Sequence, residues 1–337
     1  MSARLQPQAA YEATFAHNFW KQVRSSVPPV PATINLAGKT VLVTGANVGL
    51  GLEAARSFLA LHPSLLIMGV RSVAKGNAAA AALRQDFPSA RIDVWELDMA
   101  SFRSVQAFAT RAERELDRLH VAVLNAGLGQ MKFERVDEGA CHEVTIQVNY
   151  VATALLSLLL LPKMRPTPTS KEPGRLSIVN SGASLPLSLD DPGNQRIVDS
   201  LDRPEQFDAL KQYGVSKLLV MMFVAKLADT VDPSQVIINC TDPGATKGTS
   251  FFRHANWIMS LGVRVFMSII GRTMKDASRI YLHSTLVLGQ ESHGSWTDWI
   301  IRCWPKFMYT EQGRQMSEKL WSETLEELRF AAVKEKL

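Results

Sequence analysis

A tyrosine and a lysine four residues apart, Tyr213 and Lys217, are the side chains of this sequence best suited to move a proton. On a helix, residues i and i+4 project from the same face. A phenol whose pKa is about 10 is a poor base at neutral pH, so it needs a neighbouring cation that stabilises the phenolate. The pair therefore predicts acid–base chemistry, although exposed Tyr and Lys side chains also meet this spacing by chance.

A glycine-rich turn lies far upstream, where residues 44–51 read Thr-Gly-Ala-Asn-Val-Gly-Leu-Gly. Glycines permit a tight turn, let the backbone approach a pyrophosphate and let a helix pack close to a strand. The turn follows an apolar run and precedes a stretch of helical composition, so free N–H groups and the positive end of a helix dipole would face bound phosphates. This context predicts a dinucleotide-binding site.

The end of the next apolar run indicates which dinucleotide. An acidic residue there would hold the ribose 2′-hydroxyl of NAD, whereas an arginine accommodates the 2′-phosphate of NADP. Residues 68–72 read Met-Gly-Val-Arg-Ser and contain no carboxylate. Arg71, with Ser72 and Lys75 close by, favours NADP(H) over NAD, and the alternative is that Arg71 is only a solvated residue after a strand.

Short apolar runs alternate with longer stretches of helical composition from Lys39 onward. The runs are continuously apolar, as expected of strands buried on both faces of a parallel sheet. This alternation predicts an α/β fold with a doubly wound parallel sheet, the Rossmann fold. The predicted strands are 40–44, 65–70, 92–97, 121–124, 176–180 and 236–240, and the predicted helices are 51–61, 72–87, 101–118, 137–164 and 207–230.

Three parts are predicted along the chain: an amino-terminal arm (1–37), a dinucleotide-binding catalytic domain (38–310) and a carboxyl-terminal helical tail (311–337). The arm holds a short helix over 12–23 and then a proline-rich stretch that excludes regular structure. In the tail, apolar residues recur on one helix face, which predicts docking on the domain. Two segments exceed ordinary loop length, 182–206 and a substrate lid at about 245–275, and such insertions are often functional. The tail's apolar residues are Met316, Leu320, Leu325 and Leu328.

Further short motifs follow the other predicted strands. They are Asn125-Ala126-Gly127, Asn180-Ser181-Gly182 and Asp242-Pro243-Gly244. Together with the glycine turn and the Tyr213/Lys217 pair, in this order, they resemble the short-chain dehydrogenase/reductase family over roughly residues 38–300. Residues 207–224, the long segment between Ser181 and Tyr213, and the tail are most similar to fungal members acting in secondary metabolism.

The resemblance implies a catalytic set of Asn149, Ser181, Tyr213 and Lys217. Lys217 would stabilise the phenolate and bond the nicotinamide ribose, Ser181 would hold the substrate oxygen, and Asn149 would anchor a proton-relay water. In reduction, hydride would pass from NADPH to a carbonyl carbon while Tyr213 donates the proton, and oxidation would be the reverse. The cofactor-binding residues implied are Thr44, Gly45, Asn47, Gly49, Leu50, Gly51, Arg71, Asp98, Asn125, Ala126, Gly127, Tyr213, Lys217, Pro243, Gly244 and Thr246.

Several assignments have alternatives. A two-residue slip would put Ala183 in the place of Ser181, and Ser184 is also near. Asp98 and Asn125 would flank the adenine and the cofactor ribose, but each also suits a turn after a strand, and Asp98 or Ser101 could cap the next helix.

The segment after Pro243 departs from the family pattern. The family often has Thr or Ser four residues after the glycine of its Pro-Gly, where this chain has Gly248 between Thr246 and Thr249. Asp242 replaces the commoner Asn, and the sequence offers no physical reason for it.

The composition argues against several other functions. The 37 Lys+Arg and 32 Asp+Glu residues give a net charge of +5 without a basic run, so nucleic-acid binding is not expected. Three scattered cysteines (Cys141, Cys240 and Cys303) and seven histidines show neither disulfide nor metal spacing, which favours reduced thiols in a cytoplasmic protein and no metal site. Neither a signal peptide nor a membrane-spanning segment of about twenty apolar residues is predicted.

The sequence therefore predicts an NADP(H)-dependent dehydrogenase or reductase acting on a ketone or secondary alcohol. The apolar content of residues 251–270 favours a bulky lipophilic metabolite as substrate. A redox-neutral enzyme on the same fold (an epimerase, dehydratase or cyclase) and a non-catalytic NADP-binding sensor are the alternatives. A homodimer is expected if the long helices pair as they commonly do in the family, unless the arm and tail cover them.

Overall fold

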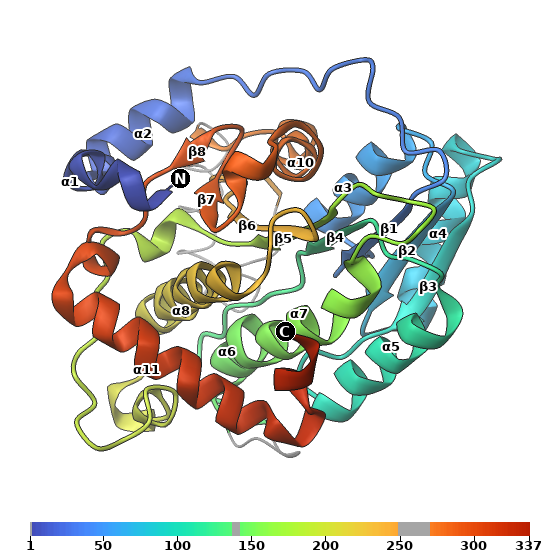
Figure 1. Ribbon diagram of the computed structural model, residues 1–337. Coiled ribbons are helices and arrows are strands. Elements are labelled where there is room, and N and C mark those ends of the chain that lie inside the picture. The colour runs from blue at the N-terminus through green and yellow to red at the C-terminus, as the bar shows by residue number, and fades with distance from the viewer. Residues whose placement is uncertain (1, 137–141, 249–269) are drawn as a thin grey trace.

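The computed structural model describes residues 2–136, 142–248 and 270–337 (Figure 1). Within these residues the strands form one eight-stranded sheet in the order β3-β2-β1-β4-β5-β6-β7-β8. Strands β1 to β7 pair in parallel and β8 pairs antiparallel with β7. This topology confirms the doubly wound α/β prediction. The strands are β1 (Thr40–Thr44), β2 (Leu65–Val70), β3 (Ile92–Glu96), β4 (Val121–Leu124), β5 (Gly174–Val179), β6 (Val236–Thr241), β7 (Ser295–Thr297) and β8 (Ile301–Arg302).

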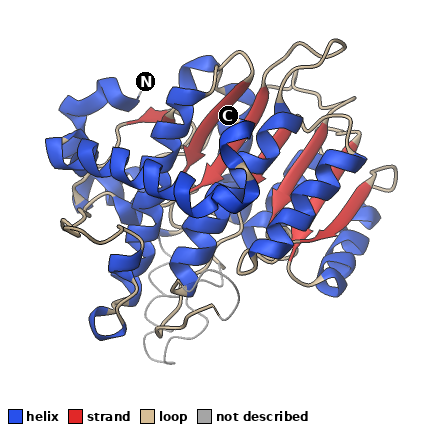
Figure 2. Cartoon of the chain, turned by 60° about the horizontal axis from the view of Figure 1, so that its bottom comes forward, coloured by secondary structure: helices blue, strands red, loops and turns tan. Residues whose placement is uncertain are grey.

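Helices cover both faces of the sheet (Figure 2). On one face, α3 (Gly49–Leu59), α4 (Val73–Asp86) and α10 (Met274–Leu282) enclose a core that contains Val41 and Val43. On the other, α5 (Phe102–Glu115), α7 (Ala152–Met164) and α8 (Ala209–Thr230) enclose a core that contains Leu42. Because neighbouring residues of β1 enter opposite cores, its apolar run is continuous, as the sequence indicated.

Residues Val144–Met164 form one continuous, mostly buried helix that ends in α7. A short α6 (Val144–Ile146) continues through a π-helical turn, Gln147–Val151, into α7. The whole span, Val144–Met164, is long and apolar enough to cross a membrane, but 89% of its most apolar window is buried inside the fold. We therefore assign it to the core, within the helix predicted over residues 137–164.

The amino-terminal arm lies against the β7–β8 end of the sheet, where Figure 1 shows it in blue. It comprises a 3-10 helix (Ser2–Gln8), α1 (Ala9–Glu12) and α2 (Phe15–Arg24). Ser2 is fully buried, and its hydroxyl accepts from Trp296 N (2.9 Å) and contacts the carbonyl oxygen of Arg302. Its backbone nitrogen donates to Ser295 Oγ at 3.2 Å. The first described residue therefore bonds to both terminal strands.

The carboxyl-terminal tail packs on the α8 side of the molecule. Helix α11 (Glu311–Glu327) continues in 3-10 turns to Lys336, and Met316, Leu320, Leu325 and Leu328 are all buried, as expected. The tail also holds the 182–206 segment: Arg196 pairs with Glu327 (2.6 Å). That segment is thus fixed along α11 and contributes Leu185, Leu189, Ile197 and Val198 to the core.

Candidate active site

The parallel strands bring the predicted motifs to one edge of the sheet. Strands β1, β4, β5 and β6 are consecutive neighbours, so Gly45, Asn125, Ser181 and Asp242 all follow adjacent carboxyl ends. Ligands of open α/β sheets bind outside these ends. The structure therefore gathers residues that lie almost two hundred positions apart in the chain.

The glycine turn has the geometry its residue types predicted. Gly45 and Gly49 adopt φ of +66° and +60°, and a Cβ on Gly51 would lie 2.4 Å from the carbonyl oxygen of Gly45. Helix α3 then begins at Gly49 after Val48, whose side chain accepts no capping bond from it. The first N–H groups of α3 are thus available for phosphate oxygens, and the turn fits a dinucleotide.

Two residues predicted to contact the cofactor hold the turn in place. Asn125 donates to Thr44 O (2.9 Å) and accepts from the Tyr281 hydroxyl (3.0 Å). The fully buried Thr44 hydroxyl accepts from Ala126 N at 2.9 Å. The side chains of Thr44 and Asn125 therefore bond to protein groups. Asn47 and Leu50 are half-buried in the turn itself.

The carboxyl end of β2 presents the predicted basic residue to solvent. Arg71 is exposed and has neither an ion-pair nor a hydrogen-bond partner in the parts of the chain that the structure describes. Ser72 caps α4 by accepting from Lys75 N, although the contact is long (3.4 Å). An exposed guanidinium beside the glycine turn's strand fits a 2′-phosphate.

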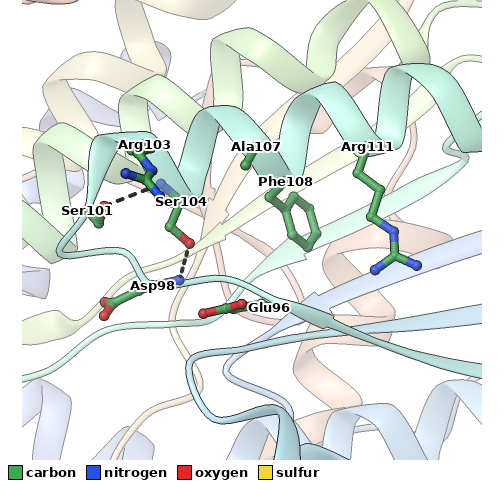
Figure 3. A pocket seen from close by; sticks show the side chains of 8 residues that line it. All are labelled: Glu96, Asp98, Ser101, Arg103, Ser104, Ala107, Phe108 and Arg111. Atoms are coloured by element: carbon green, nitrogen blue, oxygen red, sulfur yellow. Dashed lines mark hydrogen bonds between the residues drawn. The ribbon is translucent and has the colours of Figure 1, made fainter.

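Asp98 shows the turn geometry that was its alternative role. Its carboxylate accepts from Ala100 N (3.0 Å), while Ser101 caps α5 through Ser104 N. A pocket of about 480 Å³ opens beside it, between α5 and the edge strand β3 (Figure 3). Its lining carries both charge signs, and none of Ser181, Tyr213 and Lys217 belongs to it. The lining residues are Glu96, Asp98, Ser101, Arg103, Ser104, Ala107, Phe108 and Arg111.

Tyr213 and Lys217 lie on consecutive turns of α8, as predicted. Lys217 Nζ is 5.8 Å from the Tyr213 ring centroid and donates to Val179 O at 2.9 Å. Only 5% of Lys217 is exposed, and burial lowers its pKa to about 8, although the nearby Asp242 carboxylate acts in the opposite direction. Near neutral pH this ammonium is charged without a carboxylate bonded to it among the described residues.

Burial raises the pKa of Tyr213 to about 12, against the opposing effect of a hydrogen bond with the Ser181 side chain. The phenol therefore keeps its proton at neutral pH. A protonated phenol beside a cation suits proton donation to an oxygen that is gaining negative charge.

The structure favours Ser181 over the two alternatives. Ser181 follows β5 and its side chain bonds to Tyr213. Ser184 is fully buried and its hydroxyl donates to Ser181 O (2.9 Å), while Ala183 is exposed and has no hydroxyl. Ser181 is thus the hydroxyl that accompanies Tyr213 in this loop.

Asn149 lies in the π-helical turn beneath the pair. Its side chain exchanges two hydrogen bonds with the backbone of Leu128, accepting from N (2.9 Å) and donating to O (2.8 Å). A Cβ on Gly127 would lie 3.1 Å from Asn149 Oδ1 and 3.5 Å from Lys217 Nζ. The Asn-Ala-Gly motif is therefore tied directly to the catalytic set.

Asp242 has a structural role that the sequence did not reveal. Its carboxylate accepts from Gly182 N (3.1 Å) and Gly244 N (2.8 Å), so it joins the serine-bearing loop to the Pro-Gly turn. The oxygen of an asparagine could accept one of these bonds, but its amide NH₂ would then face the other N–H donor. In the turn itself, Thr246 donates to Gly244 O at 3.1 Å, whereas Thr249 lies outside the described residues.

Asn180 was quoted in a motif but given no role by the sequence. It donates to Lys217 O (3.0 Å), and its Oδ1 accepts from Ser181 N (2.6 Å). One side chain thus fixes the backbone of the helix and of the serine together. Its only sequence signal is its position directly before Ser181 at a strand end.

Comparisons with known proteins agree with these motifs. Residues 39–188 match the model of the short chain dehydrogenase family. Short chain dehydrogenase virL of Hypocrea virens is 44% identical, over 98% of this chain and 96% of that protein. Short chain dehydrogenase opdN of Penicillium oxalicum is 43% identical, over 88% and 97%. The chain belongs to the short-chain dehydrogenase family.

Members of known structure share the fold of this short-chain dehydrogenase at low sequence identity. An NADPH-bound short chain oxidoreductase from Pseudomonas aeruginosa is 22% identical with a TM-score of 0.58, over 78% of this chain and 96% of that one. The RhlG/NADP complex from the same species is 20% identical with a TM-score of 0.57, over 78% and 95%. These likenesses show the same Rossmann fold, and the family to which the chain belongs is a family of oxidoreductase enzymes.

Proposed function

We propose that this short-chain dehydrogenase uses NADP(H) to interconvert a ketone and a secondary alcohol on a bulky lipophilic metabolite. The observation that carries the proposal is the cluster of Ser181, Tyr213 and Lys217 beside the glycine turn. Asn149 is linked to this cluster through Ser216, whose hydroxyl accepts from Asn149 Nδ2 (3.0 Å) and donates to Tyr213 O (2.7 Å). The nicotinamide, when bound, supplies or accepts the hydride.

In the reductive direction the chain's own residues handle the oxygen. Ser181 donates a hydrogen bond to the carbonyl oxygen and orients it toward Tyr213. As negative charge develops on that oxygen, the Tyr213 hydroxyl transfers its proton there, and the Lys217 ammonium stabilises the phenolate left behind. Asn149 holds the position from which a water could return a proton to this site.

The preference for NADP(H) rests on Arg71. Its guanidinium is exposed, follows β2 and has no partner among the described residues. Residues 68–72 contain no carboxylate, and Lys75 lies in the first turn of α4. The solved structures named above are NADP(H) complexes, in agreement with this assignment.

The proposed substrate class rests on the composition of the lid segment and on the source of the relatives. The predicted lid spans about residues 245–275, and residues 249–269 of it lie outside the described residues. Its composition favours a lipophilic ligand, and the relatives virL and opdN come from fungi. We therefore propose a role in fungal secondary-metabolite biosynthesis and, from three cysteines without disulfide spacing, a cytoplasmic location.

The test follows NADPH absorbance during incubation with a panel of ketones, for wild type and Tyr213→Phe. We expect a turnover loss of about 10²-fold or more in the variant, because its ring keeps the position but has no proton to donate. Tyr11→Phe, at an exposed tyrosine of the arm, is the control. Substrate conversion without an absorbance change would refute hydride transfer and favour a redox-neutral reaction.

The cofactor assignment is tested by Arg71→Asp. We expect weaker NADPH binding and a relative gain for NADH, since a carboxylate repels the 2′-phosphate and can accept from a 2′-hydroxyl. Arg114→Asp, at another exposed arginine, controls for net charge. Unchanged discrimination between the two cofactors would rule out the 2′-phosphate contact.

A further inference from the structure

The arm helix α2 packs on the loop that follows β6. Lys21 forms an ion pair with the buried Asp298 (2.6 Å) and lies over the rings of Trp296 and Trp299. The neighbouring Gln22 points its carboxamide at the Pro-Gly turn. The arm therefore reaches the protein next to the proposed nicotinamide end of the site.

Gln22 uses its full hydrogen-bonding capacity there. Its Nε2 donates to Ala245 O (2.8 Å) and Ile270 O (3.2 Å). Its Oε1 accepts from Ala245 N (3.2 Å) and Arg272 Nη1 (3.1 Å). A primary amide offers two donor hydrogens and two acceptor lone pairs, and all four are engaged.

The contacted groups depend on this one side chain. Within the described residues, Gln22 is the partner of Ala245 N, and Arg272 is 8% exposed with Nε and Nη2 unpartnered. The backbone of Arg272 pairs with that of Ala245 and Lys247, so the chain entering and the chain leaving the 249–269 segment meet beneath Gln22. Loss of the Gln22 amide would leave buried polar groups without hydrogen-bond partners in both segments, around Ala245 and around Arg272.

The turn is held from opposite sides. From the domain, the Asp242 carboxylate accepts from Gly244 N. From the arm, the Gln22 carboxamide accepts from the N–H of the next residue, Ala245. Space around the turn is closed, because a Cβ on Gly244 would lie 2.3 Å from Arg272 Nη1 and 2.6 Å from Gln22 Oε1. The conformation of Pro243–Thr246 is thus set jointly by the domain and by the arm.

We propose that Gln22 is a positioning residue that holds the Pro243–Thr246 turn in the shape that receives the nicotinamide half of NADP(H). The inference rests on the proposed function. It makes the amino-terminal arm part of the active site, although the arm precedes the dinucleotide-binding sequence.

The test compares binding of NADPH with binding of adenosine 2′,5′-bisphosphate, the half of the cofactor that does not extend to this turn. For Gln22→Ala we expect the Kd for NADPH to rise about tenfold and the Kd for the bisphosphate to stay unchanged. Asn18→Ala removes two side-chain hydrogen bonds that stay within the arm and should change neither constant.

The outcomes separate this inference from the proposed function. Equal loss of affinity for both ligands, or no loss for either, in Gln22→Ala would overturn the positioning role. Wild type that binds neither ligand would instead refute the NADP(H) site itself. If Gln22→Ala does not fold, Gln22→Glu is measured in the same assay. It keeps the acceptor for Ala245 N and Arg272 but loses both donors, so we expect the same selective rise in the Kd for NADPH, and equal or absent loss for both ligands would overturn the positioning role.

Discussion

Lys217 is a buried cation whose charge the proposed chemistry requires. Its pKa, lowered by burial to about 8, means that it is charged below that pH and loses its proton above it. We therefore expect kcat/KM for NADPH-dependent reduction to fall with rising pH above about 8, since this parameter reports groups of the free enzyme. A pH–rate profile checks this, and a flat profile to pH of about 10 would contradict it.

Asp242 should set the position of that fall. Its negative charge raises the pKa of both Tyr213 and Lys217. In Asp242→Asn we expect the alkaline fall of kcat/KM to move to lower pH, by up to about one unit. Asp191→Asn is the matched control, because Asp191 also accepts from a glycine N–H but lies in an exposed turn. An unshifted profile would exclude the electrostatic effect.

Local sequence was sufficient for part of the site. Three features could be predicted because each depends on residues close in sequence or on the end of a predicted strand. They are the glycine turn, the Tyr213/Lys217 pair and the Asn-Ala-Gly motif. The roles of Gln22 and Asp242 could not, since their hydrogen bonds join segments brought together only by the sheet. Gln22 and Ala245 lie 223 positions apart.

At the scale of elements, His142 fastens the 182–206 segment and the tail to the domain. Its ring nitrogens bond to Asp202 (2.6 Å) and Glu327 (2.7 Å), and Glu327 also pairs with Arg196. Burial would lower the pKa of His142, but these two hydrogen bonds and the carboxylate charges outweigh it and raise it to about 9. With both nitrogens donating to carboxylates, the ring is an imidazolium at neutral pH.

The folded state therefore binds this proton more tightly than the unfolded chain. The stabilisation is fully present below the ordinary histidine pKa of about 6.5 and is lost as pH rises through about 9. We expect wild type to exceed His142→Gln by about 1–3 kcal/mol in the free energy of unfolding at low pH, with the difference shrinking at high pH. Urea denaturation of both proteins at several pH values checks this. A difference that grows with pH would refute it.

Elements of ordinary length were predictable to within a few residues, and short or irregular ones were not. Apolar runs gave β1, β2 and β4 with the observed bounds. Strands β7 and β8, of three and two residues, carry too little pattern to be recognised. In the described residues, the predicted helix 137–164 begins at Val144. Its π-helical turn was not predicted, because the residues of that turn resemble those of an ordinary buried helix in composition.

At the scale of the whole molecule, the chain covers its own long helices. Trp321 of α11 packs on Phe223 of α8 with ring centroids 5.7 Å apart, and the Tyr150 hydroxyl bonds to Thr324 (2.5 Å). The last residues pack on α7, where Arg165 donates to Leu337 O. The carboxyl-terminal tail thus covers part of the surfaces of α7 and α8.

We accordingly expect the full chain to be a monomer of 37.2 kDa in size-exclusion chromatography with light scattering. Removing residues 311–337 should expose the apolar surface of α7 and α8 and cause self-association, because that surface would lose its cover. A full chain of twice the monomer mass would contradict this expectation. The single substitution Leu320→Asp, at a buried position of α11, offers a milder disruption of the same contact.

The buried Ser2 has a consequence for how molecules of this protein meet at high concentration. An uncovered terminal strand can template the growth of a sheet across molecules. Ser2 bonds to Trp296 of β7 and to Arg302 of β8, so the arm covers part of that end of the sheet. The opposite end, β3, instead carries Asp93 and the exposed Glu96. The arm therefore protects one edge of the sheet, and acidic side chains disfavour the pairing of copies at the other edge.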